Sequence, residues 1–420
     1  MRSIDAVRKL CILVVMATGF FQAHSQPIQD SLDIKIGQMI LIGFPGTVAD
    51  QKVLEEIKAG KVGSVIIFEK NIPPQNSFIA LKKIIWTYQQ AAPIPLLMGI
   101  DQEGGRVNRL KDKYGFPRSI TAAAMGKDKT LDSVRFYSQA TASTLAGLGI
   151  NINFAPVVDL ATNPNNPIIA KYGRAFSAHE DSVVRMAKEV IIQHHRYGVL
   201  TSLKHFPGHG SSEGDTHHGL TDVTQTWSER ELKPYQSLID SGYADAVMTS
   251  HIVNKNLDKK GYPGTLSTDV LTGILRNQMH FNGVVFTDDM QMLAITKNYG
   301  LEEAIKLAIN AGVDIMTFSN NISGSEERTV DKVHEIIRTM VQRGEISETR
   351  IDQSFKRVMK LKARLTSKEE LLNAHAWERM REAEAEQDAL LKLNKALEEE
   401  LARVRATEGQ SKKKKKRKKN

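Results

Sequence analysis

The residues with the clearest catalytic potential lie in one glycine-rich stretch, residues 204–220. An apolar, strand-like run leads into it, so Lys204 and His205 place two polar side chains where a buried strand ends. A proline and several glycines exclude a helix and allow a shaped loop. Asp215 and His217 are two residues apart, so their side chains point to the same side if the segment is extended. A carboxylate beside an imidazole fixes the tautomer of the ring and raises the basicity of its other nitrogen, which suits general acid–base catalysis.

Two other interpretations of this stretch are open. Histidines and glycines also occur together in ordinary surface loops. A metal site could use the four histidines that are close in sequence, which are His205, His209, His217 and His218. A proline and a glycine between His205 and His209, however, break the helix that would place these two rings on one face, and the HExxH pattern is absent. The chemistry of the residues therefore favours an active-site loop without a metal ion.

Short apolar runs recur along the chain, and each is followed by a helix-like segment. None alternates with polar residues as a half-exposed strand would, which indicates buried parallel strands. The eight runs are residues 39–44, 63–68, 95–100, 152–158, 199–203, 244–249, 283–286 and 313–318. An open doubly wound sheet could also use β/α repeats, but eight units favour a single closed (β/α)8 TIM barrel.

Polar residues gather where these runs end. They are Asp101, Asp159, Lys204, His205, His251, Asp288 and Asn320. Enzymes with this fold build their active sites at the carboxyl ends of the strands, so the pattern predicts an enzyme with its site at that rim. His251 could equally be a hydrogen-bonded histidine of the core.

Two of these positions have further local features. After the third run, Gly104-Gly105 can make a tight turn that brings Asp101 and a distant arginine onto one ligand, although a salt bridge at the rim would use the same pair. After the seventh run, Asp288 and Asp289 are adjacent, so on a strand their side chains point to opposite faces and one of them enters the barrel mouth. Asp289 also suits the N-cap of a helix.

Three segments, in this order, resemble glycoside hydrolase family 3. They are residues 101–107 (DQEGGRV), 204–210 (KHFPGHG) with the Asp-x-His that follows, and 286–290 (FTDDM). The similarity extends from about Ile34 to about Leu365 and is strongest to the β-N-acetylglucosaminidase branch. It implies a retaining exo-β-N-acetylglucosaminidase, with a β-glucosidase or an N-acetylglucosaminide phosphorylase as alternatives within the family. A non-catalytic, sugar-binding barrel is a more distant alternative.

The same resemblance implies roles for individual residues. The catalytic residues would be Asp288 as nucleophile, His217 as acid/base and Asp215 as the group that orients His217. The sugar would be bound by Asp101, Arg109, Arg174, Lys204 and His205, of which Arg174 rests on a short match in the segment YGRAF. The implied substrates are glycosides with a terminal N-acetylglucosamine, from cell-wall or chitin fragments, and neither a metal ion nor an organic cofactor is implied.

The first 25 residues have the pattern of a secretory signal peptide. A basic start is followed by an apolar segment, residues 10–21, and by small residues before Gln26. We therefore expect cleavage before Gln26 and export to the periplasm or beyond; an uncleaved N-terminal anchor is the alternative. The apolar segment is too short for a membrane-spanning helix. Cys11, the only cysteine of the chain, lies within it, so the mature chain would contain no disulfide.

The composition changes near Ser367. The formal net charge is +9, and residues 412–419 supply eight of the positive charges, so the rest of the chain is close to neutral and its charge indicates no nucleic-acid partner. We expect a catalytic domain at residues 30–366, a charged helical extension at 367–410 and a disordered polybasic tail at 411–420 that could contact anionic surfaces. Nothing in the resemblance requires this tail, so an appended, non-native segment is an alternative.

Overall fold

The computed structural model describes residues 31–128, 130–216, 219–321 and 330–365, and also residues 387–399 with gaps at 393 and 397. The expected signal peptide, His217 and the expected polybasic tail lie outside the described residues. The described residues between 387 and 399 are helical, and the expected domain boundaries remain predictions.

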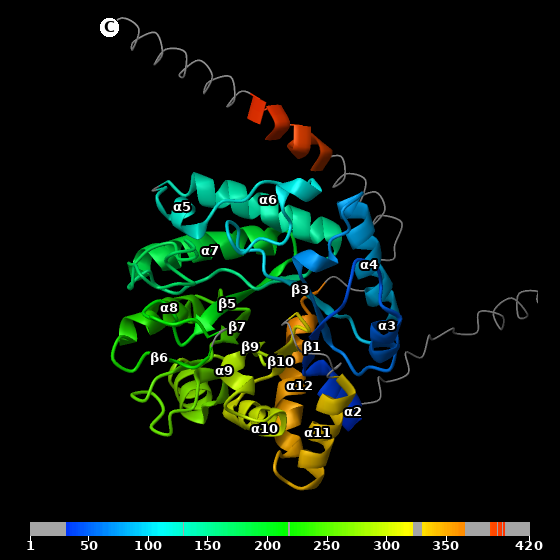
Figure 1. Cartoon of the computed structure of the whole chain (residues 1–420), viewed down its shortest axis with the longest axis vertical. Helices are drawn as coiled ribbons and strands as arrows, with labels where there is room; N and C mark the ends of the chain where they lie inside the picture. The colour runs from blue at the N-terminus through cyan, green and yellow to red at the C-terminus, as the bar shows by residue number, and fades with distance from the viewer. Residues whose placement is uncertain are drawn as a thin grey trace, which may run out of the picture. The chain divides into compact units, whose positions relative to one another are not determined.

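Eight parallel strands close into a barrel, which confirms the predicted fold (Figure 1). Each barrel strand pairs with the next one along the chain, and the last pairs with the first. The strands are β1 (Ile40–Gly43), β2 (Ser64–Ile67), β3 (Leu97–Ile100), β4 (Ile152–Asn153), β5 (Leu200–Phe206), β7 (Ala246–Thr249), β9 (Val284–Asp289) and β10 (Ile315–Phe318). A separate two-stranded parallel sheet joins β6 (Thr221–Asp222) to β8 (Ile252–Val253).

Alternate side chains of the barrel strands enter two different layers of the core. One set fills the barrel interior, where the rings of Phe154 and Phe286 meet edge to face with their centroids 5.2 Å apart. The other set packs outward beneath the helices. Because both faces of every strand are covered, the strands are continuously apolar, as the sequence pattern indicated.

Helices surround the barrel; one precedes β1, and the others follow strands along the chain. They are α2 (Leu32–Gln38), α3 (Gln51–Lys58), α4 (Ser77–Ala91), α5 (Ala122–Gly126), α6 (Asp132–Leu148), α7 (Glu180–Arg196), α8 (Lys233–Asp240), the π-helix η5 (Asp269–Gln278), α9 (Leu293–Thr296), α10 (Leu301–Ala311), α11 (Val330–Gln342) and α12 (Glu348–Lys362). Among the described residues, no helix combines the length and the apolar character needed to cross a membrane.

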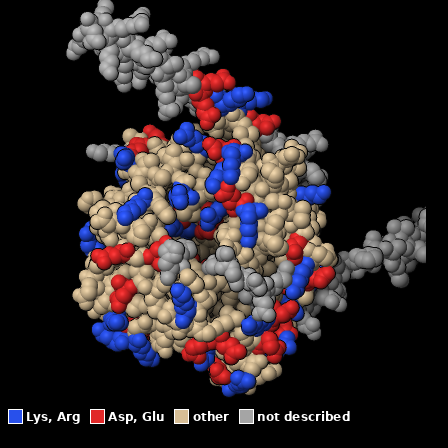
Figure 2. Space-filling view, in the orientation of Figure 1, with Lys and Arg blue, Asp and Glu red and all other residues tan. Residues whose placement is uncertain are grey.

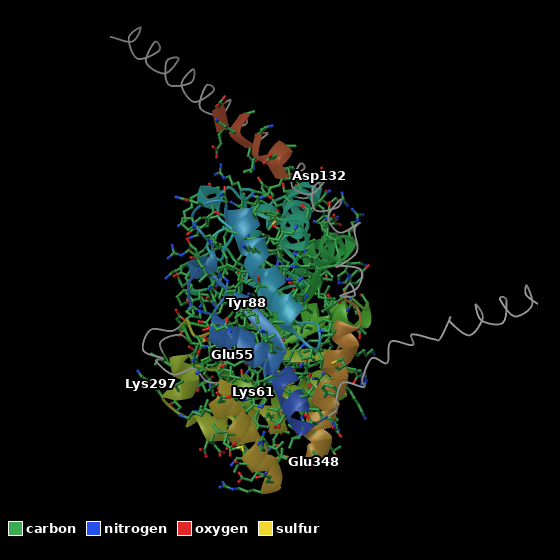
Figure 3. The ribbon with its side chains drawn as sticks, turned by 90° about the vertical axis from the view of Figure 1, so that its right-hand side faces the viewer. Glu55, Lys61, Tyr88, Asp132, Lys297 and Glu348 are labelled. Atoms are coloured by element: carbon green, nitrogen blue, oxygen red, sulfur yellow. The ribbon has the colours of Figure 1, made fainter. Side chains whose placement is uncertain are left out.

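The helices α3 and α4 show how individual residues start a helix and pack it against its neighbours. The carboxylate of Asp50 accepts the Val53 N–H and so starts α3. In Figure 3, Glu55 of α3 and Tyr88 of α4 are labelled; Glu55 is exposed, whereas Tyr88 is fully buried. The hydroxyl of Tyr88 accepts the Asp50 N–H at 2.8 Å, which satisfies a polar group that burial would otherwise leave without a partner.

Three strands end three or more residues away from the end of the predicted run, whereas the other boundaries differ by at most two residues. The run 152–158 forms a strand only at Ile152–Asn153, because Pro156 has no N–H for the ladder. In contrast, β5 and β9 extend further than predicted, to Phe206 and Asp289. Lys204, His205 and Asp288 therefore belong to strands rather than to the loops that follow them. Backbone hydrogen bonding does not depend on side-chain polarity, so a polar rim residue does not by itself end a strand.

Candidate active site

Two predicted site residues continue the interior face of their strands. In β3, β5 and β9, the side chains of Leu97, Leu200 and Phe286 fill the barrel interior. Counting on by twos reaches Asp101 just beyond β3 and Lys204 in β5. Asp288 lies near the carboxyl end of β9, two residues after Phe286, where the pairing of β9 with β10 is irregular. The barrel therefore brings an acid, a lysine and a second acid to the same rim. Figure 2 shows a hollow near the middle of this view, with acidic and basic side chains close to it.

Lys204 is held between two carboxylates. Its side chain is 2% exposed, and its Nζ lies 2.7 Å from Asp101 Oδ1 and 2.7 Å from Glu103 Oε1. Burial would raise the pKa of Asp101, but the positive charges of Lys204 and Arg109 outweigh this effect and keep the pKa below its usual range. A buried ammonium needs such partners, because an isolated charge in the interior is strongly unfavourable.

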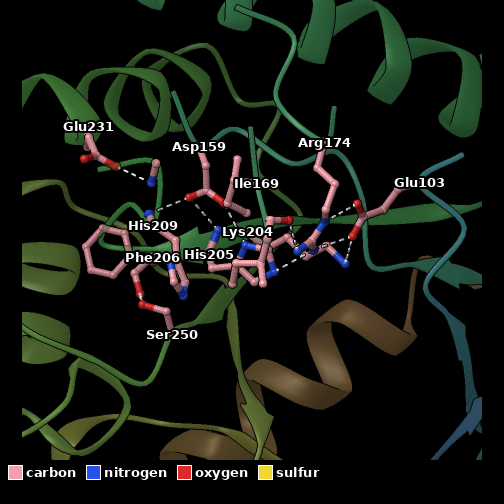
Figure 4. Close-up of polar contacts among 12 residues, drawn as sticks. Glu103, Asp159, Ile169, Arg174, Lys204, His205, Phe206, His209, Glu231 and Ser250 are labelled. Atoms are coloured by element: carbon pink, nitrogen blue, oxygen red, sulfur yellow. Dashed lines mark hydrogen bonds and ion pairs between the residues drawn. The ribbon is translucent and has the colours of Figure 1, made fainter. Parts of the chain in front are cut away.

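Arg174 joins the same group through a two-pronged ion pair. Its Nε lies 2.8 Å from Glu103 Oε2, and its Nη2 lies 2.8 Å from Glu103 Oε1 (Figure 4). This bidentate geometry is among the stronger pairings available to side chains. Burial acts to raise the pKa of Glu103, but the charges of Arg174 and Lys204 hold it well below the usual range.

His205 is fixed by neighbours on both sides of its ring. Arg174 Nη2 lies 3.2 Å from His205 Nε2, and Asp159 Oδ2 lies 2.7 Å from His205 Nδ1. A guanidinium can only donate, so His205 Nε2 accepts from Arg174 and His205 Nδ1–H donates to Asp159. These contacts favour the neutral ring with its proton on Nδ1.

We call these connected residues the charged cluster. They are Asp101, Glu103, Arg109, Asp159, Arg174, Lys204 and His205. The cluster contains all five predicted sugar-binding residues. It also contains two further residues: Glu103, for which the sequence predicts no role, and Asp159, which the sequence identifies only as a polar residue at the rim. Glu103 lies two residues after Asp101, and this spacing is the one feature of the sequence that could have indicated its place in the site.

The loop after β3 is shaped by Gln102. Its Oε1 accepts the N–H groups of Arg109 at 2.9 Å and Leu110 at 3.0 Å, which ties the end of the loop to its beginning. Asn153 of β4 holds the Gln102 backbone in turn, through two hydrogen bonds of 3.0 Å. Arg109 is thereby brought back to Asp101, and their charged atoms lie 3.4 Å apart. The salt bridge considered for this pair is therefore present within a larger cluster.

The predicted tight turn is present in this loop. Gly104 and Gly105 have φ values of 98° and 62°, a region that other residues rarely adopt. A Cβ atom on Gly104 would lie 2.4 Å from the carbonyl oxygen of Ile120, so glycine is also required by the available space.

Asp288 and Asp289 end β9, where its pairing with β10 is irregular between Phe286 and Asp289. Asp289 is hydrogen-bonded to the hydroxyl of Ser319 and accepts the N–H of Gln291 at 3.0 Å. Burial raises the pKa of Asp289 to about 6. The expectation that Asp289 caps a helix is wrong: α9 begins later, at Leu293, and Asp289 instead closes a turn against β10. The Asp288 carboxylate accepts the Asp289 N–H at 2.8 Å, and its direction toward the barrel mouth stays a prediction.

His251 belongs to the supporting structure. Its ring is fully buried, its Nδ1 lies 2.8 Å from Thr265 Oγ1, and its Nε2 lies 3.0 Å from the carbonyl oxygen of Asp289. The core interpretation of His251 therefore describes it well, and the ring supports the backbone that carries Asp288. The rim residue Asn320 hydrogen-bonds to Gln291 through its backbone N–H at 2.7 Å.

The segment after β5 begins with residues 207–212, which several hydrogen bonds hold in place and which we call the base of the loop. Asp159 Oδ1 accepts the His209 N–H at 2.8 Å, and Asn166 Nδ2 donates to the carbonyl oxygens of His209 and Gly210. Burial lowers the pKa of His209 to about 4, so the ring is neutral at pH 7. Neither ring nitrogen of His209 has a hydrogen-bond partner among the described residues.

Residues 212–220 follow this base, and we call them the Asp-x-His loop. Asp215 is partly buried, whereas His217 lies outside the described residues, so the distance between the two is not part of the structure. Among the residues that the structure describes, no group of three or more His, Cys, Asp or Glu side chains is arranged to hold a metal ion.

Comparison with known proteins places this geometry in a family. Residues 31–361 match the glycosyl hydrolase family 3 N-terminal domain. The chain is 32% identical over 289 residues to a β-hexosaminidase of Tolumonas auensis, and the alignment covers 68% of this chain and 84% of that protein. It is 30% identical over 347 residues to an Arthroderma benhamiae protein described as a secreted glycosyl hydrolase, covering 80% of this chain and 94% of that protein.

A solved structure gives the same result. The glycoside hydrolase family 3 β-N-acetylglucosaminidase from Paenibacillus sp. str. FPU-7 matches with a TM-score of 0.72 and 33% identity, covering 84% of this chain and 68% of that chain. The resemblance inferred from three short segments is thus confirmed along most of the barrel. The chain belongs to glycosyl hydrolase family 3 and is a glycoside hydrolase.

Proposed function

We propose that the chain is a retaining exo-β-N-acetylglucosaminidase that releases terminal N-acetylglucosamine from cell-wall or chitin-type glycosides. One observation carries this proposal: a buried cluster of fixed donors and acceptors shares the barrel rim with Asp288, in a chain similar to a β-hexosaminidase and to a β-N-acetylglucosaminidase. Fixed polar groups recognise sugar hydroxyls without the cost of reorganising at the moment of binding.

The proposed reaction has two displacements. Asp288 attacks the anomeric carbon, while protonated His217 donates its proton to the leaving oxygen, and a glycosyl-enzyme ester forms. Neutral His217 then takes a proton from water, which attacks the ester and releases the sugar with its configuration retained. Asp215 orients His217 and stabilises its imidazolium form, as a carboxylate does beside other catalytic histidines.

The charged cluster supplies the sugar site in this proposal. Asp101 accepts hydrogen bonds from sugar hydroxyls, while Arg109, Arg174 and Lys204 donate to sugar oxygens. His205 completes the site with its ring held by Asp159. The ion pairs of the free site fix these side chains before substrate binds, so little rotamer freedom remains to be lost.

Water is the favoured acceptor over phosphate. The cations Lys204, Arg174 and Arg109 all form ion pairs with carboxylates of the charged cluster. These pairings leave little net positive charge to attract a phosphate dianion. This charge balance supports hydrolysis over the phosphorylase alternative.

A substrate comparison tests the proposal. The enzyme is incubated with nitrophenyl β-N-acetylglucosaminide and with nitrophenyl β-glucoside, each with and without phosphate, and the sugar product is identified. We expect strong preference for the acetamido sugar and free N-acetylglucosamine in both buffers. Preference for the glucoside would favour the β-glucosidase, and N-acetylglucosamine-1-phosphate as the main product would favour the phosphorylase. No turnover of either substrate would support the non-catalytic barrel.

Export is also part of the proposal. The N-terminal sequence has the pattern of a signal peptide, and a similar protein is described as secreted. N-terminal sequencing should therefore find a mature protein that begins near Gln26 outside the cytoplasm. An intact Met1 on a cytoplasmic protein would contradict this proposal.

A further inference from the structure

Two described residues on either side of His217 lie in contact: a Cβ atom on Gly214 would be 2.8 Å from Thr221 Oγ1. The far end of the Asp-x-His loop is fixed by the pairing of β6 with β8, in which Thr221 lies opposite Ile252, and by the Val223 N–H, which donates to the Val253 carbonyl at 2.8 Å.

At the near end of the loop, residues 210–211, Glu231 adds a buried carboxyl group to the contacts made by Asp159 and Asn166. Glu231, which is 1% exposed, accepts the N–H of Gly210 at 2.8 Å and the N–H of Ser211 at 3.2 Å. Figure 4 shows Glu231 directed at this backbone from the side opposite Arg174 and Glu103. A Cβ atom on Gly208 would lie 2.5 Å from Glu231 Cβ, so the backbone and Glu231 are closely packed.

Two neighbours complete this anchor. Asn163 Nδ2 donates to the Ser212 carbonyl at 3.0 Å, and Trp227 Nε1 donates to the Pro207 carbonyl at 3.2 Å. The base of the loop is thus attached to the segment after β4 and to the segment before α8. Glu231 differs from these neighbours because it is buried, and because it satisfies two consecutive backbone donors with a single side chain.

We propose that Glu231 is a positioning residue for the acid–base step, because it fixes the base from which the Asp-x-His loop presents Asp215 and His217. The inference rests on the proposed function of these two residues. Glu231 contacts backbone rather than substrate. A displacement of about 1 Å in a catalytic group can lower the rate about 100-fold. A small shift of the backbone that Glu231 holds can therefore slow the reaction strongly.

Glu231→Gln is the main test. The amide keeps the shape of the side chain, but its NH2 group would oppose one of the two N–H donors. With a nitrophenyl leaving group, the first step hardly needs an acid, whereas the second step still needs a base. We expect a burst of nitrophenol equal to the enzyme concentration, then a steady state about 10- to 100-fold slower than wild type, with KM lowered in parallel. Added azide, an anionic nucleophile that needs no base, should restore turnover and yield the glycosyl azide.

Two further variants separate positioning from stability. Asn163→Ala removes a weaker contact at the same base, so its steady state after the burst should be slowed less than that of Glu231→Gln. This variant keeps the test available if Glu231→Gln folds poorly. Asp245→Asn is the control for stability: Asp245 immediately precedes β7, is buried, accepts the N–H of Thr201 in β5 at 2.9 Å, and pairs with His195 and Arg364. It should lower the melting temperature and show neither a burst nor azide rescue.

The outcomes distinguish this inference from the proposed function. Folded Glu231→Gln and Asn163→Ala enzymes with wild-type kcat, no burst and no response to azide would overturn the inference. A raised KM with an unchanged slow step would also overturn it, because Glu231 would then act on sugar binding. Failure of the wild-type enzyme to release N-acetylglucosamine would instead refute the proposed function itself.

Discussion

At the residue scale, Glu103 links the two most buried cations of the charged cluster. Its oxygens lie 2.7 Å from Lys204 Nζ and 2.8 Å from the nearest Arg174 nitrogens. If Glu103 loses its charge, Arg174 no longer has its main carboxylate partner and Lys204 retains only Asp101. The side chain that the sequence left without a role is therefore the one that holds both cations in place.

Glu103→Gln should consequently weaken both folding and catalysis. Removing one partner of a buried ion pair typically costs about 3–5 kcal/mol of stability. We expect a large fall in the denaturant midpoint and a rise in KM of about tenfold or more, as the sugar ligands lose their fixed positions. Glu55→Gln on the exposed surface of α3 is the control and should behave as wild type. Wild-type KM and stability in Glu103→Gln would show that the cluster does not need this residue.

The sequence predicted which residues lie in the charged cluster better than which of them form ion pairs with one another. The five expected sugar ligands do meet in one cluster, because motif residues at barrel strand ends share one rim. The roles of Glu103 and Asp159 were missed because ion pairing between loops depends on tertiary contacts. His217 lies outside the described residues, so its expected role stays a prediction.

At the element scale, the ends of β5 and β9 matter more than their apolar centres. The apolar runs located all eight barrel strands, since strands covered on both faces are continuously hydrophobic. They did not locate the ends of these strands at Phe206 and Asp289, because the backbone ladder continues through polar residues. Proline in the fourth run had the opposite effect and shortened β4.

The contact between α7 and β4 predicts a dependence of stability on pH. His194 of α7 is buried, accepts from Asn153 Nδ2 at 3.0 Å, and donates to the Val190 carbonyl at 2.8 Å. Burial lowers its pKa from 6.5 to about 4. Between these values the unfolded chain binds more protons than the folded chain, so stability present above pH 6.5 is lost as the pH falls toward 4.

His194→Gln should remove this contribution. Protonation of His194 should lower the free energy of unfolding of the wild type by roughly 2.5 kcal/mol between pH 7.5 and pH 4.5. The variant should lack this part of the decrease. Urea unfolding at several pH values measures the difference. Parallel curves for the two proteins would contradict the assignment of a depressed pKa to His194.

At the scale of the whole molecule, all residues with a proposed catalytic or sugar-binding role precede residue 290. The barrel ends with α12, where buried Lys362 donates to Gln38 Oε1 at 2.6 Å and to the Gly63 carbonyl at 2.7 Å. The family match likewise ends at residue 361. The strongly basic segment beyond thus has no part in the proposed chemistry.

Truncation after residue 366 should therefore leave kcat and KM for the nitrophenyl substrate unchanged. It should weaken binding to anionic vesicles or to anionic cell-wall polymer, most visibly at low salt, because exposed charges are screened as ionic strength rises. Full-length protein at the same salt concentrations is the comparison. A large loss of turnover would show that the extension contributes to the barrel or to the site.

The central claim is that Asp288 forms the covalent intermediate, and active-site labelling tests it most directly. Wild-type enzyme is treated with a mechanism-based fluorosugar of the N-acetylglucosamine type, digested, and the modified peptide is sequenced by mass spectrometry, with Asp288→Ala as the unlabelled control. The account predicts one sugar per chain on Asp288, and a folded Asp288→Ala enzyme without turnover. Labelling of Asp289, or retained hydrolysis in Asp288→Ala, would contradict it.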